Sequence, residues 1–182
     1  MKKLCTFFLL CIAAVLPAQV RIPGPGGTPG VAPDKAFITN QILGTPRNDQ
    51  PGSVGFRVMV GAANLTVTQL GRWVISGNTD THLVKITADG TNTALASCSV
   101  DTSVGTPGTY EYCTLGTPFL MLSGVVYAVL VVETTGSDFW YDNSDTSVSP
   151  SADGTVPSGS FNGGGNGGMN MVYVPPNFKY HL

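Results

Sequence analysis

The sequence predicts an all-β protein, an antiparallel β-sandwich that is jelly-roll-like and has about nine strands. Short segments rich in Val, Thr and Tyr recur between clusters of turn residues. The 23 glycines and 13 prolines interrupt the chain too often for long helices. Beyond the first 18 residues, no stretch repeats its apolar side chains with the 3.6-residue period of a helix.

The expected strands follow one another along the chain, each bounded by turn residues. Asp89-Gly90 is a hairpin-type turn signal, and Gly71 suggests a bulge inside a longer strand. The stretch 119–132 is the most apolar, but Ser123-Gly124 interrupts it, so it predicts a loop that leads into a buried central strand. The predicted strands are 36–41, 54–61, 65–76, 82–87, 94–100, 109–115, 125–135, 138–142 and 169–174.

The chain is predicted to have three parts. Residues 1–18 combine Lys2 and Lys3 with a 13-residue apolar run, which is typical of a secretory signal peptide and too short to span a membrane. Residues 19–34 form a Pro/Gly-rich linker, and residues 35–182 form the β-sandwich domain. Within that domain, 143–168 reads as a long Gly-rich loop, which predicts a functional or mobile segment.

Charge excludes some classes of partner. Only 11% of the residues are charged, and removal of the signal peptide leaves seven basic and eleven acidic residues, a net charge of −4. Nucleic acids and anionic membranes bind clusters of Lys and Arg, so we expect neither as a partner.

Two cysteines, Cys98 and Cys113, remain after the signal peptide. An even number in an exported chain favours a disulfide, and neighbouring antiparallel strands would bring the two together. Two buried free thiols are the alternative.

One segment, 138–143, joins aromatic rings to polar side chains. Sandwich modules that bind sugars stack rings on the sugar face and hydrogen-bond its hydroxyl groups, which makes Asp138, Trp140, Tyr141 and Asn143 the candidate ligand-binding residues. Alternate residues of a strand face opposite ways, so part of this group must face the core. Core or edge packing of every ring is the alternative.

The same region suggests a calcium site. Asp142 and Asp145 are hard oxygen ligands close together on a loop, although their spacing does not match an EF-hand. A solvated turn that hydrogen-bonds its own backbone is the alternative. We expect no other cofactor, because the G-x-G-x-x-G at 163–168 lacks the strand–helix context and the later acidic residue of a dinucleotide site.

The sequence offers little for catalysis. His82 and Asp80 could belong to a Ser-His-Asp triad, but no serine has the nucleophile-elbow pattern. A glycosidase needs two facing carboxyl groups, and we expect the two glutamates, Glu111 and Glu133, on an outer face of their strands. We therefore predict that the protein is not an enzyme.

The order of several motifs resembles a bacterial extracellular domain family of uncharacterised function. The matching pieces together cover roughly Ser53 to Tyr180, and they are VGFRV (54–58), LTVTQLG (65–71), THLVKI (81–86), ALASCSV (94–100), LSGVVYAV (122–129) and YVPPNFKY (173–180). The resemblance implies an antiparallel β-sandwich in an exported, often surface-attached protein. It implies no catalytic residues.

These observations predict a non-catalytic binding module that is secreted, whether extracellular, periplasmic or surface-associated. A polysaccharide or another cell-surface molecule is the expected ligand. The alternative is a self-associating structural component of the cell surface or matrix, and a hydrolase is the weakest alternative.

Overall fold

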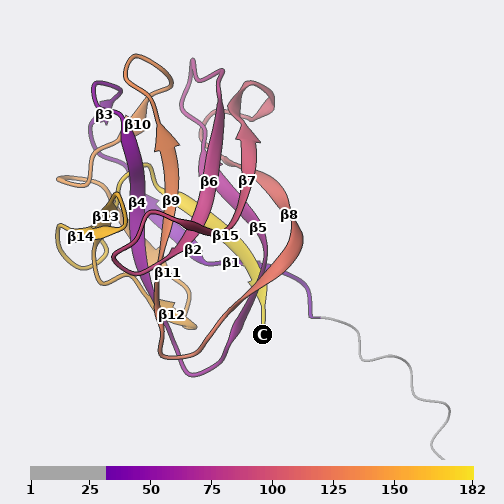
Figure 1. Ribbon diagram of the computed structural model, residues 1–182. Coiled ribbons are helices and arrows are strands. Elements are labelled where there is room, and N and C mark those ends of the chain that lie inside the picture. The colour runs from indigo at the N-terminus through magenta and orange to yellow at the C-terminus, as the bar shows by residue number, and fades with distance from the viewer. Residues whose placement is uncertain (1–31) are drawn as a thin grey trace, which may run out of the picture. The chain divides into compact units, whose positions relative to one another are not determined.

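The computed structural model describes residues 32–182, so the predicted signal peptide and all but the end of the predicted linker lie outside the described residues. Two antiparallel sheets pack face to face, and the predicted β-sandwich is confirmed (Figure 1). The described residues contain no α-helix, and none of their elements could cross a membrane as a helix. The strands are β1 (Lys35–Ala36), β2 (Ile38–Ile42), β3 (Pro46–Arg47), β4 (Gly52–Val60), β5 (Leu65–Trp73), β6 (Thr81–Ala88), β7 (Ala94–Asp101), β8 (Tyr110–Met121), β9 (Val126–Glu133), β10 (Trp140–Tyr141), β11 (Ser147–Pro150), β12 (Gly154–Thr155), β13 (Gly159–Phe161), β14 (Gly164–Asn166) and β15 (Pro176–His181), with one 3-10 turn, η1 (Thr102–Val104).

The two main sheets differ in size. The four-stranded sheet has the order β1-β15-β5-β8, and the seven-stranded sheet has the order β14-β13-β4-β9-β6-β7, with β12 also paired to β4. Two short pairs, β10-β3 and β11-β2, lie apart from them. There are more strands than the nine expected because seven of the fifteen have four residues or fewer.

The core lies between the two sheets and is built from the inward-facing alternate residues of the long strands. Phe56 of the large sheet and Phe178 of the small sheet are both fully buried, as is Phe37. The Phe37 ring stacks on Phe178 with a centroid distance of 4.6 Å and lies 6.2 Å from Phe56. Aromatic packing of this kind joins the two sheets.

The Gly-rich segment 143–168 was predicted to be one long loop, but it carries four short strands, β11 to β14. Its glycines allow close backbone packing. A Cβ on Gly159 would lie 2.8 Å from the carbonyl oxygen of Asn166, and one on Gly163 would lie 1.8 Å from that of Thr91. The sequence predicts a flexible loop because glycine occurs both in flexible loops and where two backbones pack closely.

The last strand lies after the predicted strand 169–174 and overlaps the segment 173–180, which the family resemblance implied as an aromatic last strand. Residues 169–174 make only isolated bridges, and β15 is formed by Pro176–His181 in the interior of the small sheet. Phe178 and Tyr180 are fully buried while Lys179 and His181 are not, which is the alternation expected of a strand with one face on the core.

The predicted disulfide between Cys98 and Cys113 is confirmed. Its strands are neighbours but not partners in one sheet: β7 ends the large sheet and β8 ends the small one. The bond therefore joins the two sheets along one open side of the sandwich, where β7 and β8 run side by side (Figure 1).

Candidate functional site

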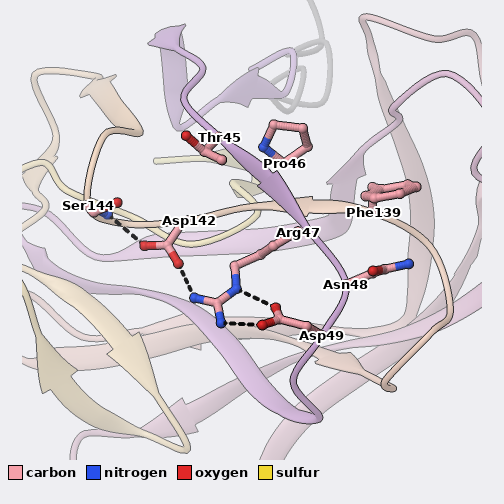
Figure 2. A pocket seen from close by; sticks show the side chains of 8 residues that line it. All are labelled: Thr45, Pro46, Arg47, Asn48, Asp49, Phe139, Asp142 and Ser144. Atoms are coloured by element: carbon pink, nitrogen blue, oxygen red, sulfur yellow. Dashed lines mark hydrogen bonds and ion pairs between the residues drawn. The ribbon is translucent and has the colours of Figure 1, made fainter.

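An open hollow of about 390 Å³ lies at one end of the sandwich. It is formed by the segment 45–49, which precedes β4, and by residues of 139–144, which follow β9. Since Gly52 of β4 pairs with Glu133 of β9, both segments leave the large sheet at the same end. The lining residues are Thr45, Pro46, Arg47, Asn48, Asp49, Phe139, Asp142 and Ser144 (Figure 2).

A carboxylate–guanidinium–carboxylate group forms one wall of this hollow. Figure 2 shows the guanidinium of Arg47 between the carboxylates of Asp49 and Asp142. Arg47 donates to both oxygens of Asp49, from Nε at 2.7 Å and from Nη2 at 3.1 Å, and its Nη1 donates to Asp142. Fork-like pairing of this kind fixes the orientation of both carboxylates. The three side chains together carry a charge of −1.

Both carboxylates are held in the ionised form. The hydrogen bonds from Arg47 lower the pKa of Asp49. Burial raises the pKa of Asp142, but hydrogen bonds from Arg47 and Ser144 outweigh it, so this pKa also lies below its usual value. Near neutral pH neither group carries a proton to give.

Phe139 supplies the exposed aromatic surface of the hollow. Its side chain is 44% exposed, whereas its neighbour Trp140 is only 1% exposed. The Trp140 ring packs edge-on against the Tyr173 ring with a centroid distance of 5.9 Å. The guanidinium carbon of Arg47 lies over the Trp140 ring, 5.1 Å from its centroid. The prediction that Trp140 stacks on a ligand is therefore wrong, because strand alternation turns Trp140 into the core and Phe139 outward.

The other candidate residues of 138–143 also have structural partners. Asp138, also predicted to bind a ligand, is 5% exposed and does not line the hollow. Tyr141 is half-buried and pairs with Pro46 in the short β3–β10 ladder. Asn143 is half-buried, and its Nδ2 donates to the carbonyl of Asn166 at 3.2 Å, so it holds the Gly-rich segment.

The two predicted calcium ligands are used by the protein itself. Asp142 accepts from Arg47 and from the backbone of Ser144, and Asp145 accepts from the backbone and hydroxyl of Thr45 at 3.0 and 2.6 Å. These contacts correspond to the solvated-turn alternative. Within residues 32–182, neither aspartate belongs to a group of three acidic, His or Cys ligands.

A buried ionic network that the sequence reading missed lies beneath the hollow. Arg72 of β5 and Glu133 of β9 are fully buried and form a two-pronged ion pair between the sheets, with Nε–Oε1 at 3.0 Å and Nη2–Oε2 at 3.2 Å. The expectation that Glu133 faces outward is wrong. His82 of β6, 3% exposed, lies between Glu133 and Asp138.

A signal for this network exists in the sequence. Val129, Val131 and Glu133 occupy alternate positions of β9, so the strand period places Glu133 on the same inward face as the two valines. Leu70 and Arg72 are related in the same way on β5. The charges of Arg72 and Glu133 suggest exposed side chains, whereas the strand period places both side chains in the core. The strand period is correct because the two buried charges form an ion pair with each other.

Asp138 is the anchor of the segment that carries Phe139. Its carboxylate accepts from the backbone of Thr79 at 2.7 Å and of Asp80 at 3.1 Å, from Thr102 Oγ1 at 2.5 Å and from His82 Nε2 at 3.0 Å. Despite burial, these hydrogen bonds lower the pKa of Asp138.

Asp80, His82 and Asp138 are also close enough to hold a metal ion, and they are the one such group within the described part of the chain. A carboxylate accepts about four hydrogen bonds, and Asp138 already accepts four. The Asp80 carboxylate in turn accepts from the hydroxyl of Ser137. The arrangement is that of a hydrogen-bonded anchor, and it forms no Ser-His-Asp triad, because Ser137 bonds to Asp80 and not to His82.

A second group of aromatic rings lies on the small sheet, across β5 and β8. Trp73 packs edge-on against Tyr110 at 5.0 Å, and the ammonium group of Lys179 lies 4.3 Å from the Tyr112 ring centre. All three rings are half-buried. They are the alternative place on the described surface for a ligand to stack.

No protein-family model matches the chain, and no curated protein matches it significantly.

Proposed function

We propose that this protein is a non-catalytic binding module that holds a saccharide unit in the hollow between 45–49 and 139–144. The observation that carries the proposal is the position of Phe139, which is 44% exposed in the same hollow as the Arg47 group. An exposed phenyl ring costs free energy in water, and a bound sugar would cover it with its apolar C–H face.

The polar lining suits a neutral polyhydroxylated ligand. The carboxylates of Asp49 and Asp142 can accept hydrogen bonds from hydroxyl groups, and the net charge of −1 disfavours anions. Because Arg47 fixes both carboxylates in advance, a ligand need not order them on binding, which reduces the entropic cost.

The same geometry supports a binding role over hydrolysis. A glycosidase needs one carboxyl group protonated near neutral pH so that it can act as the general acid. Pairing with Arg47 lowers the pKa of Asp49 and Asp142 alike. Two ionised carboxylates that share one arginine are suited to holding hydroxyl groups.

Export is part of the proposal. It is supported by the signal-like residues 1–18 and by the Cys98–Cys113 disulfide, since such bonds persist in oxidising compartments. A module outside the cell would meet polysaccharides of cell walls or matrices.

The experiment is binding of the purified protein to a panel of insoluble and immobilised polysaccharides, with two variants compared. Phe139→Ala removes the exposed ring, and Met59→Ala is the matched control, because Met59 is also 44% exposed but lies where β4 ends, away from the hollow. We expect saturable binding that is lost in Phe139→Ala and retained in Met59→Ala. Equal binding by both variants would place any site elsewhere, and no binding to any polysaccharide would contradict the proposal.

Self-association is the second candidate, and it has its own observation. Four apolar side chains around the β8–β9 turn, Met59, Leu120, Leu122 and Val125, are 39–49% exposed at the end opposite the hollow. A self-associating protein would cover them. Light scattering at high concentration decides: growth that Leu122→Ser prevents supports assembly, and a monomer at every concentration excludes it.

A further inference from the structure

His82 occupies an unusual position for an imidazole. Its Nδ1 lies 3.2 Å from the carbonyl oxygen of Val132 and 3.2 Å from Glu133 Oε2, and its Nε2 lies 3.0 Å from Asp138 Oδ2. Each of these neighbours accepts hydrogen bonds and none donates in its ionised form. A neutral imidazole has one N–H and would leave its other nitrogen facing an acceptor, so only the doubly protonated ring satisfies both sides.

Charge balance agrees with this protonation state. The charged and titratable groups that face His82 are Arg72 of β5, Glu133 of β9, Asp138 of the β9–β10 segment and Asp80 before β6. With an imidazolium, the buried members Arg72, Glu133, His82 and Asp138 sum to zero charge. A neutral ring would leave one net negative charge in the core, which is costly.

This network also holds the ring that the hollow exposes. The Phe139 carbonyl accepts from Arg72 Nη2 at 3.1 Å and from Asn78 Nδ2 at 3.0 Å, and its backbone N–H donates to Asn78 Oδ1 at 3.1 Å. Asp138 is the preceding residue, fixed on its inner side by His82. The side chain of Asp138 therefore points into the network, and that of Phe139 points into the hollow.

We infer that the buried imidazolium of His82 positions Phe139 for ligand binding, and that deprotonation of His82 loosens the segment 134–139 and weakens the site. The regulatory part rests on the proposed function, whereas the positioning part concerns the protein alone. His82 and Asp138 are thus positioning residues, which act on a ligand only through Phe139.

The direction of the pH effect follows from the surroundings of the ring. Burial lowers the pKa of His82, but the hydrogen bond and charge of Glu133, with the bond to Asp138, outweigh burial and Arg72, so the pKa lies above its ordinary value. The stabilising contribution is therefore complete below about pH 6.5 and is lost as the pH rises through the folded-state pKa. Weak binding at alkaline pH and strong binding at acid pH are expected.

The test begins with wild-type protein, so it does not depend on whether a variant folds. The chain has two histidines, and His181→Gln assigns their imidazole signals in a long-range 1H–15N NMR spectrum. We expect His82 to be doubly protonated at acid pH and to titrate with a midpoint above the ordinary value of about 6.5. The backbone amide of Phe139 should shift with the same midpoint, while the amide of Met59 stays fixed. A His82 midpoint below about 6.5, or a Phe139 amide that does not follow the His82 titration, would overturn the inference.

A ligand from the polysaccharide panel then tests regulation. Above the His82 midpoint we expect binding about tenfold weaker, the scale of one lost charge-assisted hydrogen bond, and no such step in His82→Gln. If no polysaccharide binds but the Phe139 amide follows His82, the proposed function fails and the positioning survives. If binding at Phe139 shows no step at the His82 midpoint, the regulation fails and the proposed function survives.

Discussion

At the scale of single residues, two neighbours have opposite roles: Asp138 anchors its segment in the core, and Phe139 forms the exposed surface. Asp138 is 5% exposed, Phe139 is 44% exposed and Trp140 is 1% exposed. The sequence located this segment because aromatic and acidic residues coincide there. It could not locate the face, since both Phe139 and Trp140 can fill a core and only the packing of Arg47 and Tyr173 on Trp140 shows which one does.

The buried ion pair gives a prediction about a single residue. Glu133→Gln removes a charge that faces both Arg72 and His82, and it leaves the Arg72 charge uncompensated in the core. Loss of one partner of a buried pair costs about 3–5 kcal/mol, so we expect the free energy of unfolding to fall by that amount in urea titrations. Glu111→Gln on β8, half-buried, is the control and should change it by less than about 1 kcal/mol. Equal effects of the two substitutions would contradict the assignment.

At the scale of strands and segments, the sequence predicted the strands with clear alternation and missed the strands rich in glycine. The prediction at 54–61 became β4 and that at 82–87 became β6, because the periodic apolar residues there fill the core. The short strands of 143–168 exist because backbones approach closely at glycines, a property of tertiary packing that local composition does not encode.

Gly71 illustrates the same point inside a strand. The sequence suggested a bulge there, whereas the register of β5 shifts between Val67 and Gln69, and Gly71 instead lies under the Tyr112 ring. A Cβ at this position would lie 2.6 Å from two ring carbons of Tyr112. The glycine therefore makes room for a cross-strand aromatic side chain.

Alanine substitutions of two glycines test this reading. Gly71→Ala should cost about 1–3 kcal/mol of unfolding free energy through overpacking against Tyr112. Gly116→Ala on β8 is the matched control: its new Cβ would meet nothing within 4 Å, so it should be neutral or stabilising by up to about 1 kcal/mol. Thermal unfolding followed by circular dichroism measures both, and a Gly71→Ala protein as stable as the control would refute the packing argument.

At the scale of the whole molecule, the sequence was sufficient for the fold class and the disulfide but not for how the sheets are connected. Segment spacing predicts a sandwich without assigning strands to sheets. The strand β15 pairs with β1 and β5, which lie far from it in the sequence. Cys98 and Cys113 lie on different sheets, which is also set by the assembly of the whole sandwich. Local pattern contains neither fact.

The inter-sheet disulfide gives a prediction for the whole domain. In the double variant Cys98→Ala/Cys113→Ala, the unfolded chain regains the freedom lost to a 15-residue closed loop, which corresponds to about 3 kcal/mol. We expect a stability loss of that order in urea unfolding, with a retained β-type circular dichroism spectrum because both sheets share one aromatic core. Reduced wild-type protein should match the variant. An unchanged unfolding free energy in both would show that the bond contributes nothing to the domain.

NMR mapping of the ligand-binding surface tests most directly whether a saccharide binds in the hollow beside Phe139. A soluble oligosaccharide of the polysaccharide that binds best is titrated into 15N-labelled protein, and the backbone amide shifts are followed. We expect the largest changes at four residues that line the hollow, Asn48, Asp49, Phe139 and Ser144. Changes confined to Trp73, Tyr110 and Tyr112 on the small sheet would contradict it and assign binding to that face.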